Sequence, residues 1–122
     1  MSDASQVLNP APSRPLREEE RDLVRSLLFG SPASTQLENL LLVSRVTDMH
    51  DGEMGSMRFL QLERRPFGKA LAEAQYVDSD GVLVSITLNA DDDGQLFELD
   101  FWKVDFSPLR RYPKPSDLVV KR

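Results

Sequence analysis

Hydrophobic positions in the first third of the chain follow a helical period. Five apolar side chains recur at the i, i+3, i+4 spacing of a half-buried helix: Leu16, Leu23, Val24, Leu27 and Leu28. Pro15 is tolerated near a helix start, and Gly30 ends the pattern. The pattern predicts a helix between these two residues. A second short helix is predicted over 35–41, with Ser34 as its N-cap, followed by an extended segment over 43–49.

From residue 56 onward the hydrophobic period is close to two, which is typical of strands. Strands are predicted over 56–62, 69–77, 82–89 and 96–104. The alanines of 69–77 leave a helix as an alternative there. Asp80-Gly81 and Asp93-Gly94 separate the last three segments, and Asp-Gly favours the primed turns of β-hairpins. These segments therefore form an antiparallel meander.

The segment 96–104 predicts which side chains face the core. Apolar and polar positions alternate, with one set formed by Phe97, Leu99 and Phe101 and the other by Glu98, Asp100 and Trp102. We expect the first set to face inward, because a slip of one residue would move the two phenylalanines into water. Glu73 lies on a neighbouring strand and could share the outer face.

The predicted fold is α+β, with one or two N-terminal helices packed on an antiparallel β-meander of about four to six strands. Residues 1–13 are rich in Ser, Pro and Ala and are interpreted as a disordered tail. Residues 14–113 form the single domain, and 114–122 are interpreted as a C-terminal tail.

Composition narrows the classes of function. The chain has 122 residues and a net charge of −5, which argues against a nucleic-acid binder and is compatible with a basic protein partner. It has no cysteine, which excludes disulfides and thiolate nucleophiles. No signal-peptide pattern and no apolar stretch of bilayer length are present, so we expect a cytoplasmic protein without membrane contact.

The turn that follows residue 47 is one candidate for metal or hydrolytic chemistry. It gathers Asp48, His50, Asp51 and Glu53, and a site of one imidazole and several carboxylates can hold a metal ion. An exposed polar turn explains the same residues, because Asp and Gly are common in turns for backbone reasons. No metal is assigned here, and a small metal-binding protein or hydrolase is kept as an alternative.

A second candidate metal site is the segment 89–100, which partly matches a calcium loop. Asn89, Asp91 and Asp93 stand at the first, third and fifth positions, and Gly94 follows at the sixth. Asp100 at the last position is shorter than the usual Glu, and the flanks have the period of strands rather than helices. A charged hairpin turn is therefore the favoured interpretation.

The favoured function is a non-catalytic protein-interaction module that binds a basic partner through an acidic sheet face. The residues expected to contact the partner are Glu73, Glu98, Asp100 and Trp102. No catalytic residue and no cofactor is assigned, because the only histidine, His50, adjoins no nucleophile motif. A homodimer through an exposed strand edge is a further alternative.

Three motifs carry a resemblance to a known family. They are the segment from Gly94 to Leu109, Arg14-Pro15-Leu16 before an acidic helix start, and the turn from Asp51 to Ser56. Over about residues 14–113 the chain resembles a family of small bacterial proteins of unknown function. Some members are similar in size and acidity to immunity proteins of polymorphic toxin systems. The resemblance implies an immunity-like interaction role and no catalytic residues.

Overall fold

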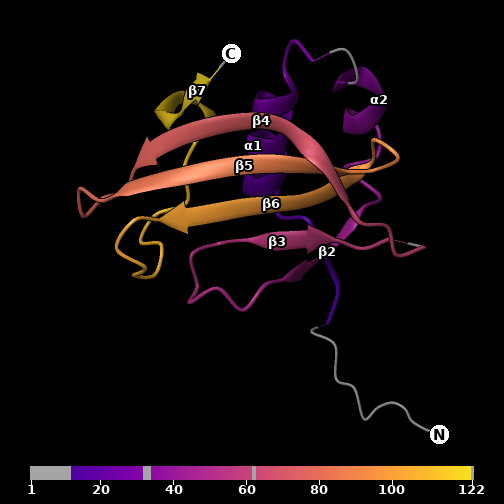
Figure 1. Cartoon of the computed structure of the whole chain (residues 1–122). Helices are drawn as coiled ribbons and strands as arrows, with labels where there is room; N and C mark the ends of the chain where they lie inside the picture. Colours follow the sequence, from indigo (N-terminus) through magenta and orange to yellow (C-terminus); the bar gives the residue numbers. More distant parts are fainter. Residues whose placement is uncertain (1–11, 32–33, 62, 122) are drawn as a thin grey trace, which may run out of the picture.

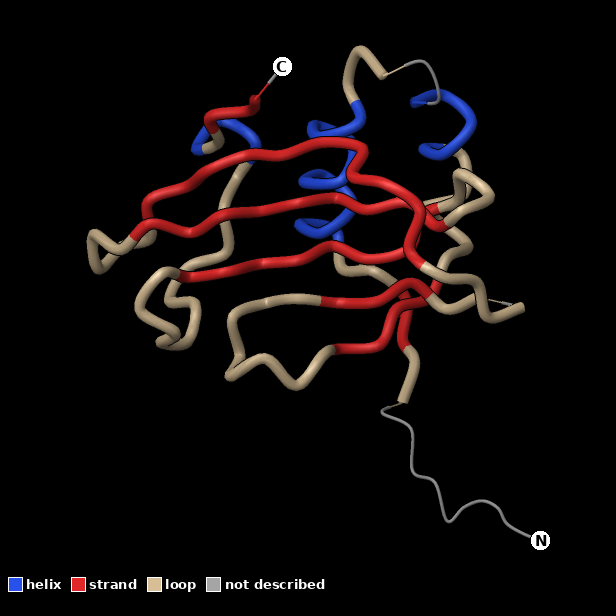
Figure 2. The backbone as a smooth tube through the Cα atoms, viewed as in Figure 1, coloured by secondary structure: helices blue, strands red, loops and turns tan. Residues whose placement is uncertain are grey.

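The computed structural model describes residues 12–31, 34–61 and 63–121 (Figure 1). Its elements in chain order are β1 (Arg14–Pro15), α1 (Glu18–Leu28), α2 (Ser34–Glu38), β2 (Arg45–Asp48), β3 (Met57–Phe59), β4 (Phe67–Val77), β5 (Leu83–Asp91), β6 (Leu96–Lys103), the 3-10 helix η1 (Pro115–Asp117) and β7 (Val119–Lys121). The α+β class is confirmed, and most of the regular structure is strand (Figure 2).

One antiparallel sheet of seven strands has the order β1-β2-β3-β6-β5-β4-β7. The predicted meander is confirmed as β4-β5-β6, joined by the two Asp-Gly turns. The prediction of four to six strands is wrong. The excess comes from β1 and β7, whose two and three residues are too short to show a period of two.

Helix α1 covers one face of the sheet, and no described element covers the opposite face (Figure 1). The predicted stripe of α1 is buried, with Leu23, Val24 and Leu28 at 0% exposure. It forms one hydrophobic core with the inward side chains of the meander and of β3: Met57, Ala74, Tyr76, Val84, Ile86, Leu88, Leu99 and Phe101. Burial of these apolar side chains is the main stabilising term of the fold.

The start of α1 differs from the prediction, because Arg14 and Pro15 pair with β2 instead of entering the helix. The helix begins at Glu18, and the buried carboxylate of Glu20 accepts a hydrogen bond from the Arg17 backbone N–H at 2.8 Å. Arg14 donates two further hydrogen bonds to Glu20, both at 2.8 Å. The hydrogen bonds to Glu20 and to Asp48 raise the pKa of Arg14.

The second helix ends earlier than predicted, at Glu38. Its first residue is Ser34, which was predicted to be the N-cap. The segment interpreted as a C-terminal tail contains η1 and β7, and β7 pairs with β4 along Glu73–Gln75. Of the predicted N-terminal tail, residues 1–11 lie outside the described residues. No helix in the described ranges combines the length and apolar character needed to cross a bilayer.

The inward orientation predicted for Phe97 is wrong. Asn89 pairs with Glu98, but the next residue, Ala90, pairs with Leu96, so Phe97 is the extra residue of a β-bulge. Leu96 is buried in its place, and Phe97 lies half-buried with the Arg58 guanidinium 5.2 Å from its ring centroid. A period of two cannot reveal such a bulge, because both residues are apolar.

Candidate functional site

The strand register brings the four predicted partner-contacting residues to one face. Glu73, Thr87 and Asp100 are paired across β4, β5 and β6, and the next row contains Gln75, Ser85 and Trp102. The alternate positions Ala74, Ile86 and Phe101 are buried under α1, so these rows point to the opposite side. We call this side the open sheet face. Glu98 joins it beside Arg58.

An exposed apolar cluster, here called the apolar patch, lies at the hairpin end of the open sheet face. Its exposed members are Val77, Trp102, Val104 and Phe106, and the half-buried Leu83 lies among them. Leu83 pairs with Val77 and its carbonyl accepts the Val104 N–H at 3.0 Å, so the three side chains share a row. Trp102 is 52% exposed and Phe106 68%, and their ring centroids are 6.3 Å apart. Such paired, exposed aromatics are typical of binding anchors.

The backbone that presents Phe106 is in an uncommon conformation. Its φ is 62°, in the left-handed region that bulky residues rarely adopt. The turn is held by a hydrogen bond from the Phe106 N–H to the Lys103 carbonyl at 2.8 Å. Asp105 accepts hydrogen bonds from the backbone N–H and hydroxyl of Ser107, at 3.0 and 2.7 Å. Strain of this kind costs on the order of 1–3 kcal/mol and is concentrated at functional sites.

A buried ion-pair cluster, here called the clasp, lies beneath this turn. The Lys103 ammonium contacts Asp78 at 2.8 Å, Asp80 at 2.6 Å and the Pro108 carbonyl at 3.0 Å. Burial alone would lower the pKa of Lys103, but the hydrogen bonds to the two carboxylates outweigh it and raise that pKa. The clasp therefore fixes the end of β6, and with it Trp102, against the β4–β5 hairpin.

Asp78 also anchors the chain that leaves the apolar patch. Its carboxylate accepts the backbone N–H groups of Arg110 at 2.8 Å and Arg111 at 3.1 Å. Burial opposes the ionised form, but these backbone hydrogen bonds and Lys103 more than compensate, and they lower the pKa of Asp78 to about 2. The segment after Phe106 is thus tied back to the same hairpin.

Asp100 lies in the middle of the open sheet face and is partly desolvated. Burial raises its pKa, and the hydrogen bond from the Ser56 hydroxyl at 3.3 Å only partly offsets this effect. Glu98, in contrast, has a basic partner, because the Arg58 guanidinium donates a hydrogen bond to its carboxylate at 2.9 Å. Glu73 is half-exposed, with Lys121 at 3.9 Å. The face therefore has one carboxylate, Asp100, without a described basic partner.

The turn of Asp48, His50, Asp51 and Glu53 lines one hollow of about 470 Å³. Both oxygens of Asp51 are used within the turn, because they accept the backbone N–H groups of Met54 and Ser56 at 3.1 and 2.9 Å. Asp48 accepts two hydrogen bonds from Arg14, and these lower its pKa. Among the described residues no three carboxylates or imidazoles converge as a metal site.

The calcium-like segment forms the predicted hairpin turn between β5 and β6 rather than a loop between helices. The buried carboxylate of Asp91 accepts the backbone N–H groups of Asp93 and Gln95, at 2.8 and 3.0 Å. Its second oxygen accepts the Gln61 amide at 2.6 Å. The side chain of Asp91 therefore shapes the turn, and Asp93 itself is exposed.

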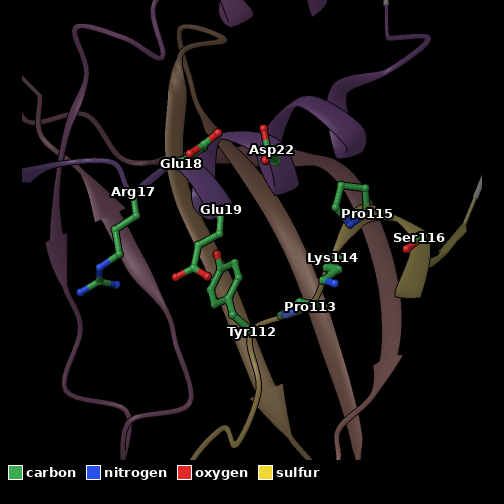
Figure 3. A pocket seen from close by; sticks show the side chains of 9 residues that line it. All are labelled: Arg17, Glu18, Glu19, Asp22, Tyr112, Pro113, Lys114, Pro115 and Ser116. Atoms are coloured by element: carbon green, nitrogen blue, oxygen red, sulfur yellow. The ribbon is translucent and has the colours of Figure 1, made fainter.

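A further hollow, of about 750 Å³, separates α1 from the segment after β6 (Figure 3). One wall carries Arg17, Glu18, Glu19 and Asp22, and the other is built by residues 112–116. The Tyr112 hydroxyl is buried and has no hydrogen-bond partner among the described residues. Burial raises the pKa of this phenol. Charges of both signs line the hollow, so it selects no obvious ligand class.

Comparison with known families places the chain in a group without assigned activity. The chain belongs to the DUF6984 family, a domain of unknown function, whose sequence model matches residues 13–113. The predicted membership of an uncharacterised family is thereby confirmed. No curated protein and no solved structure matches the chain.

The roles of three residues of the site could not be predicted from the sequence. Lys103 reads as a surface lysine, although it is 0% exposed, because its acidic partners lie more than twenty residues earlier in the chain. Phe106 reads as a strand end, and its left-handed backbone has no glycine or asparagine to signal it. Val104 reads as the last position of a strand rather than as part of an exposed cluster.

Proposed function

We propose that this protein is a non-catalytic interaction module that binds a basic protein through the open sheet face. Trp102 and Phe106 are the proposed anchors, and Asp100, Glu73 and Glu98 supply complementary charge. The exposed aromatic pair on a face that no described element covers is the observation that supports this proposal most strongly.

Charge and strain support the same surface. The chain has a net charge of −5, and Asp100 stays on the open face although burial disfavours its ionised form. A basic partner would relieve that cost by adding a cation beside Asp100. Phe106 has a left-handed backbone and an exposed side chain, which can enter a pocket of the partner.

The proposed role is similar to that of an immunity protein, in which a small acidic chain covers a basic target. Electrostatic complementarity of this kind mainly accelerates association and makes it sensitive to salt. The aromatic anchors would then determine how slowly the complex dissociates.

Affinity capture with paired baits tests the proposal. The full chain, a Trp102→Ala variant and a Leu42→Ala variant are used as baits in cells that carry the native gene neighbourhood. Leu42 is 73% exposed and lies outside the sheet, so its truncation is a matched control. We expect one basic protein to be captured by the wild-type and Leu42→Ala baits and to be lost with Trp102→Ala.

The captured protein is then purified and its affinity measured by calorimetry. We expect Trp102→Ala to weaken binding by about thirtyfold or more. Asp100→Lys should slow association and reduce its dependence on salt. Equal capture by all three baits, or a partner whose association is insensitive to salt, would overturn the proposal.

A further inference from the structure

Five hollows of the described surface differ in the charge of their walls, and one of them contains no carboxylate. It measures about 650 Å³ and lies beside β2 and β3. The side chains that carry its chemistry are Arg58, Arg64, Arg65, His50, Gln61 and Phe97. The other four hollows each contain two or more Asp or Glu residues. This arginine hollow is therefore positive in a chain whose net charge is −5.

The wall of the arginine hollow is held in place by a relay of hydrogen bonds. The Gln61 side-chain carbonyl accepts the Arg65 backbone N–H at 3.2 Å, and its amide donates to buried Asp91 at 2.6 Å. The Pro66 carbonyl accepts the Asp92 backbone N–H at 3.1 Å. The connection between β3 and β4 is thus tied to the β5–β6 hairpin, so its arginines have a defined backbone position.

The guanidinium groups keep donors for a ligand. Arg58 donates one hydrogen bond to Glu98 at 2.9 Å, and Arg65 donates one to Asp92 at 2.7 Å. A guanidinium carries five N–H donors, so each of these groups retains several. Arg64 pairs with no carboxylate among the described residues. The cluster of three arginines therefore keeps both donors and a positive charge after its internal ion pairs are counted.

The ring of Phe97 orients the guanidinium group of Arg58. The Arg58 guanidinium lies 5.2 Å from the centroid of the Phe97 ring, in cation–π geometry. Phe67 contacts the same ring edge-on, with centroids 6.5 Å apart. The bulge that turns Phe97 out of the core thus supplies the surface on which Arg58 rests. This stacking limits the conformational freedom that Arg58 would lose on binding a ligand.

We propose that the arginine hollow binds a small molecule that carries a phosphate group. Arginine matches the geometry of phosphate oxygens and forms charge-assisted hydrogen bonds with them. A volume of about 650 Å³ lies within the range of small-molecule sites, which is about 300–1,000 Å³. The site is separate from the apolar patch. Arg58 lies on β3 and Val77 lies on β4, with β6 and β5 between these two strands.

Calorimetric titration of the full chain tests this assignment with defined probes. The probes are pyrophosphate, adenosine monophosphate, adenosine and acetate, with sodium chloride used to match ionic strength. We expect saturable binding of the two phosphates only. Adenosine tests recognition of the base, and acetate tests recognition of any carboxylate. Binding of adenosine or acetate as tight as that of the phosphates would overturn the proposal, as would no saturable binding of either phosphate.

Charge variants assign the binding to the hollow. We expect Arg64→Glu and the milder Arg64→Gln to weaken phosphate binding by about tenfold to a hundredfold. Lys121→Glu on β7 makes the same charge change with three strands between it and β3, and it should leave the affinity unchanged. Thermal melts establish that both charge variants fold. Equal affinities for Arg64→Glu and wild type would place the anion elsewhere and overturn the proposal. Trp102→Ala should not affect this titration, because Trp102 does not line the hollow.

Discussion

Lys103 and Asp78 form an ion pair that has no contact with solvent, with 2.8 Å between the ammonium nitrogen and the nearer carboxylate oxygen and 0% exposure of both side chains. The pair joins the end of β6 to the first residue after β4. Because desolvation of two charges is costly, such a pair adds little net stability but is expensive to break.

Replacement of Lys103 by Met should therefore strongly destabilise the fold. The change leaves Asp78 buried without its cation, which costs about 3–5 kcal/mol. Urea unfolding followed by circular dichroism measures the loss. Lys121→Met is the matched control, because Lys121 is largely exposed and its removal should change the free energy of unfolding by less than about 0.5 kcal/mol. Equal stability of Lys103→Met and wild type would contradict the buried geometry.

The same pair predicts how stability falls in acid. The pKa of Asp78 is about 2 in the folded chain against an ordinary value of 3.8, so the unfolded chain binds protons first as the pH falls. Stability from this group is present above the ordinary value of 3.8 and is lost as the pH falls through about 2. The loss is on the order of 2 kcal/mol. Asp78→Asn should be less stable at neutral pH and show a flatter acid limb.

Asp100 should show the opposite linkage. Its folded pKa is raised, so the folded chain retains a proton that the unfolded chain has released, and stability falls as the pH rises through this interval. Asp100→Asn should thus melt at a higher temperature than wild type at neutral pH, with little difference below the ordinary carboxyl pKa. A lower melting temperature at neutral pH would show that the charge is compensated in the free protein.

Gly68 is predicted to resist substitution because of space rather than backbone angle. A Cβ atom at this position would overlap the Asp91 carbonyl group and the Asp92 backbone nitrogen. Gly68→Ala should lower the free energy of unfolding by about 1–3 kcal/mol or more, because the atoms that the new Cβ meets are backbone atoms and cannot move aside easily. Gly94 is a contrasting control, with φ of +81° and no atom within 4 Å. At position 94, Asn should be less destabilising than Ala, because Asn tolerates that backbone conformation. At position 68, Asn should be no better than Ala.

Tyr112 should tolerate the loss of its hydroxyl. The oxygen is buried without a described partner, while the ring packs on Phe101 with centroids 5.5 Å apart. Tyr112→Phe keeps the ring contact and removes an unsatisfied polar atom, so unfolding should become more difficult by about 1 kcal/mol. Tyr112→Leu, which loses the ring contact, serves as the comparison. Destabilisation by the Phe change would reveal a bound water at the hydroxyl.

Local signals in the sequence were sufficient to predict helix α1 and the three strands of the meander. The Leu23, Val24 and Leu27 stripe and the two Asp-Gly turns act over a few residues, so α1 and the β4-β5-β6 meander could be predicted. The outward positions of Glu98, Asp100 and Trp102 also follow from the period of β6. The candidate surface was predictable to that extent.

Features that depend on distant residues could not be predicted. Pro15 pairs with Arg45, and Val120 pairs with Ala74, across long loops that a short pattern does not reveal. The arginine hollow combines Arg58 with Arg64 and a bulged Phe97 from β6, so its charge emerges only when β3 and β6 are paired. The clasp is hidden for the same reason.

The uneven edges of the sheet have a consequence for how this protein behaves when crowded. One edge is β1, whose two residues include Pro15, which lacks an N–H. At the other edge β7 covers only Glu73–Gln75, and the remaining length of β4 is interrupted by register shifts next to Lys69 and Ala70. An incoming strand would meet a missing donor on one side and a bent ladder with a lysine on the other. Both edge strands are also short, at two and three residues, so the folded chain should be a poor template for edge-to-edge pairing.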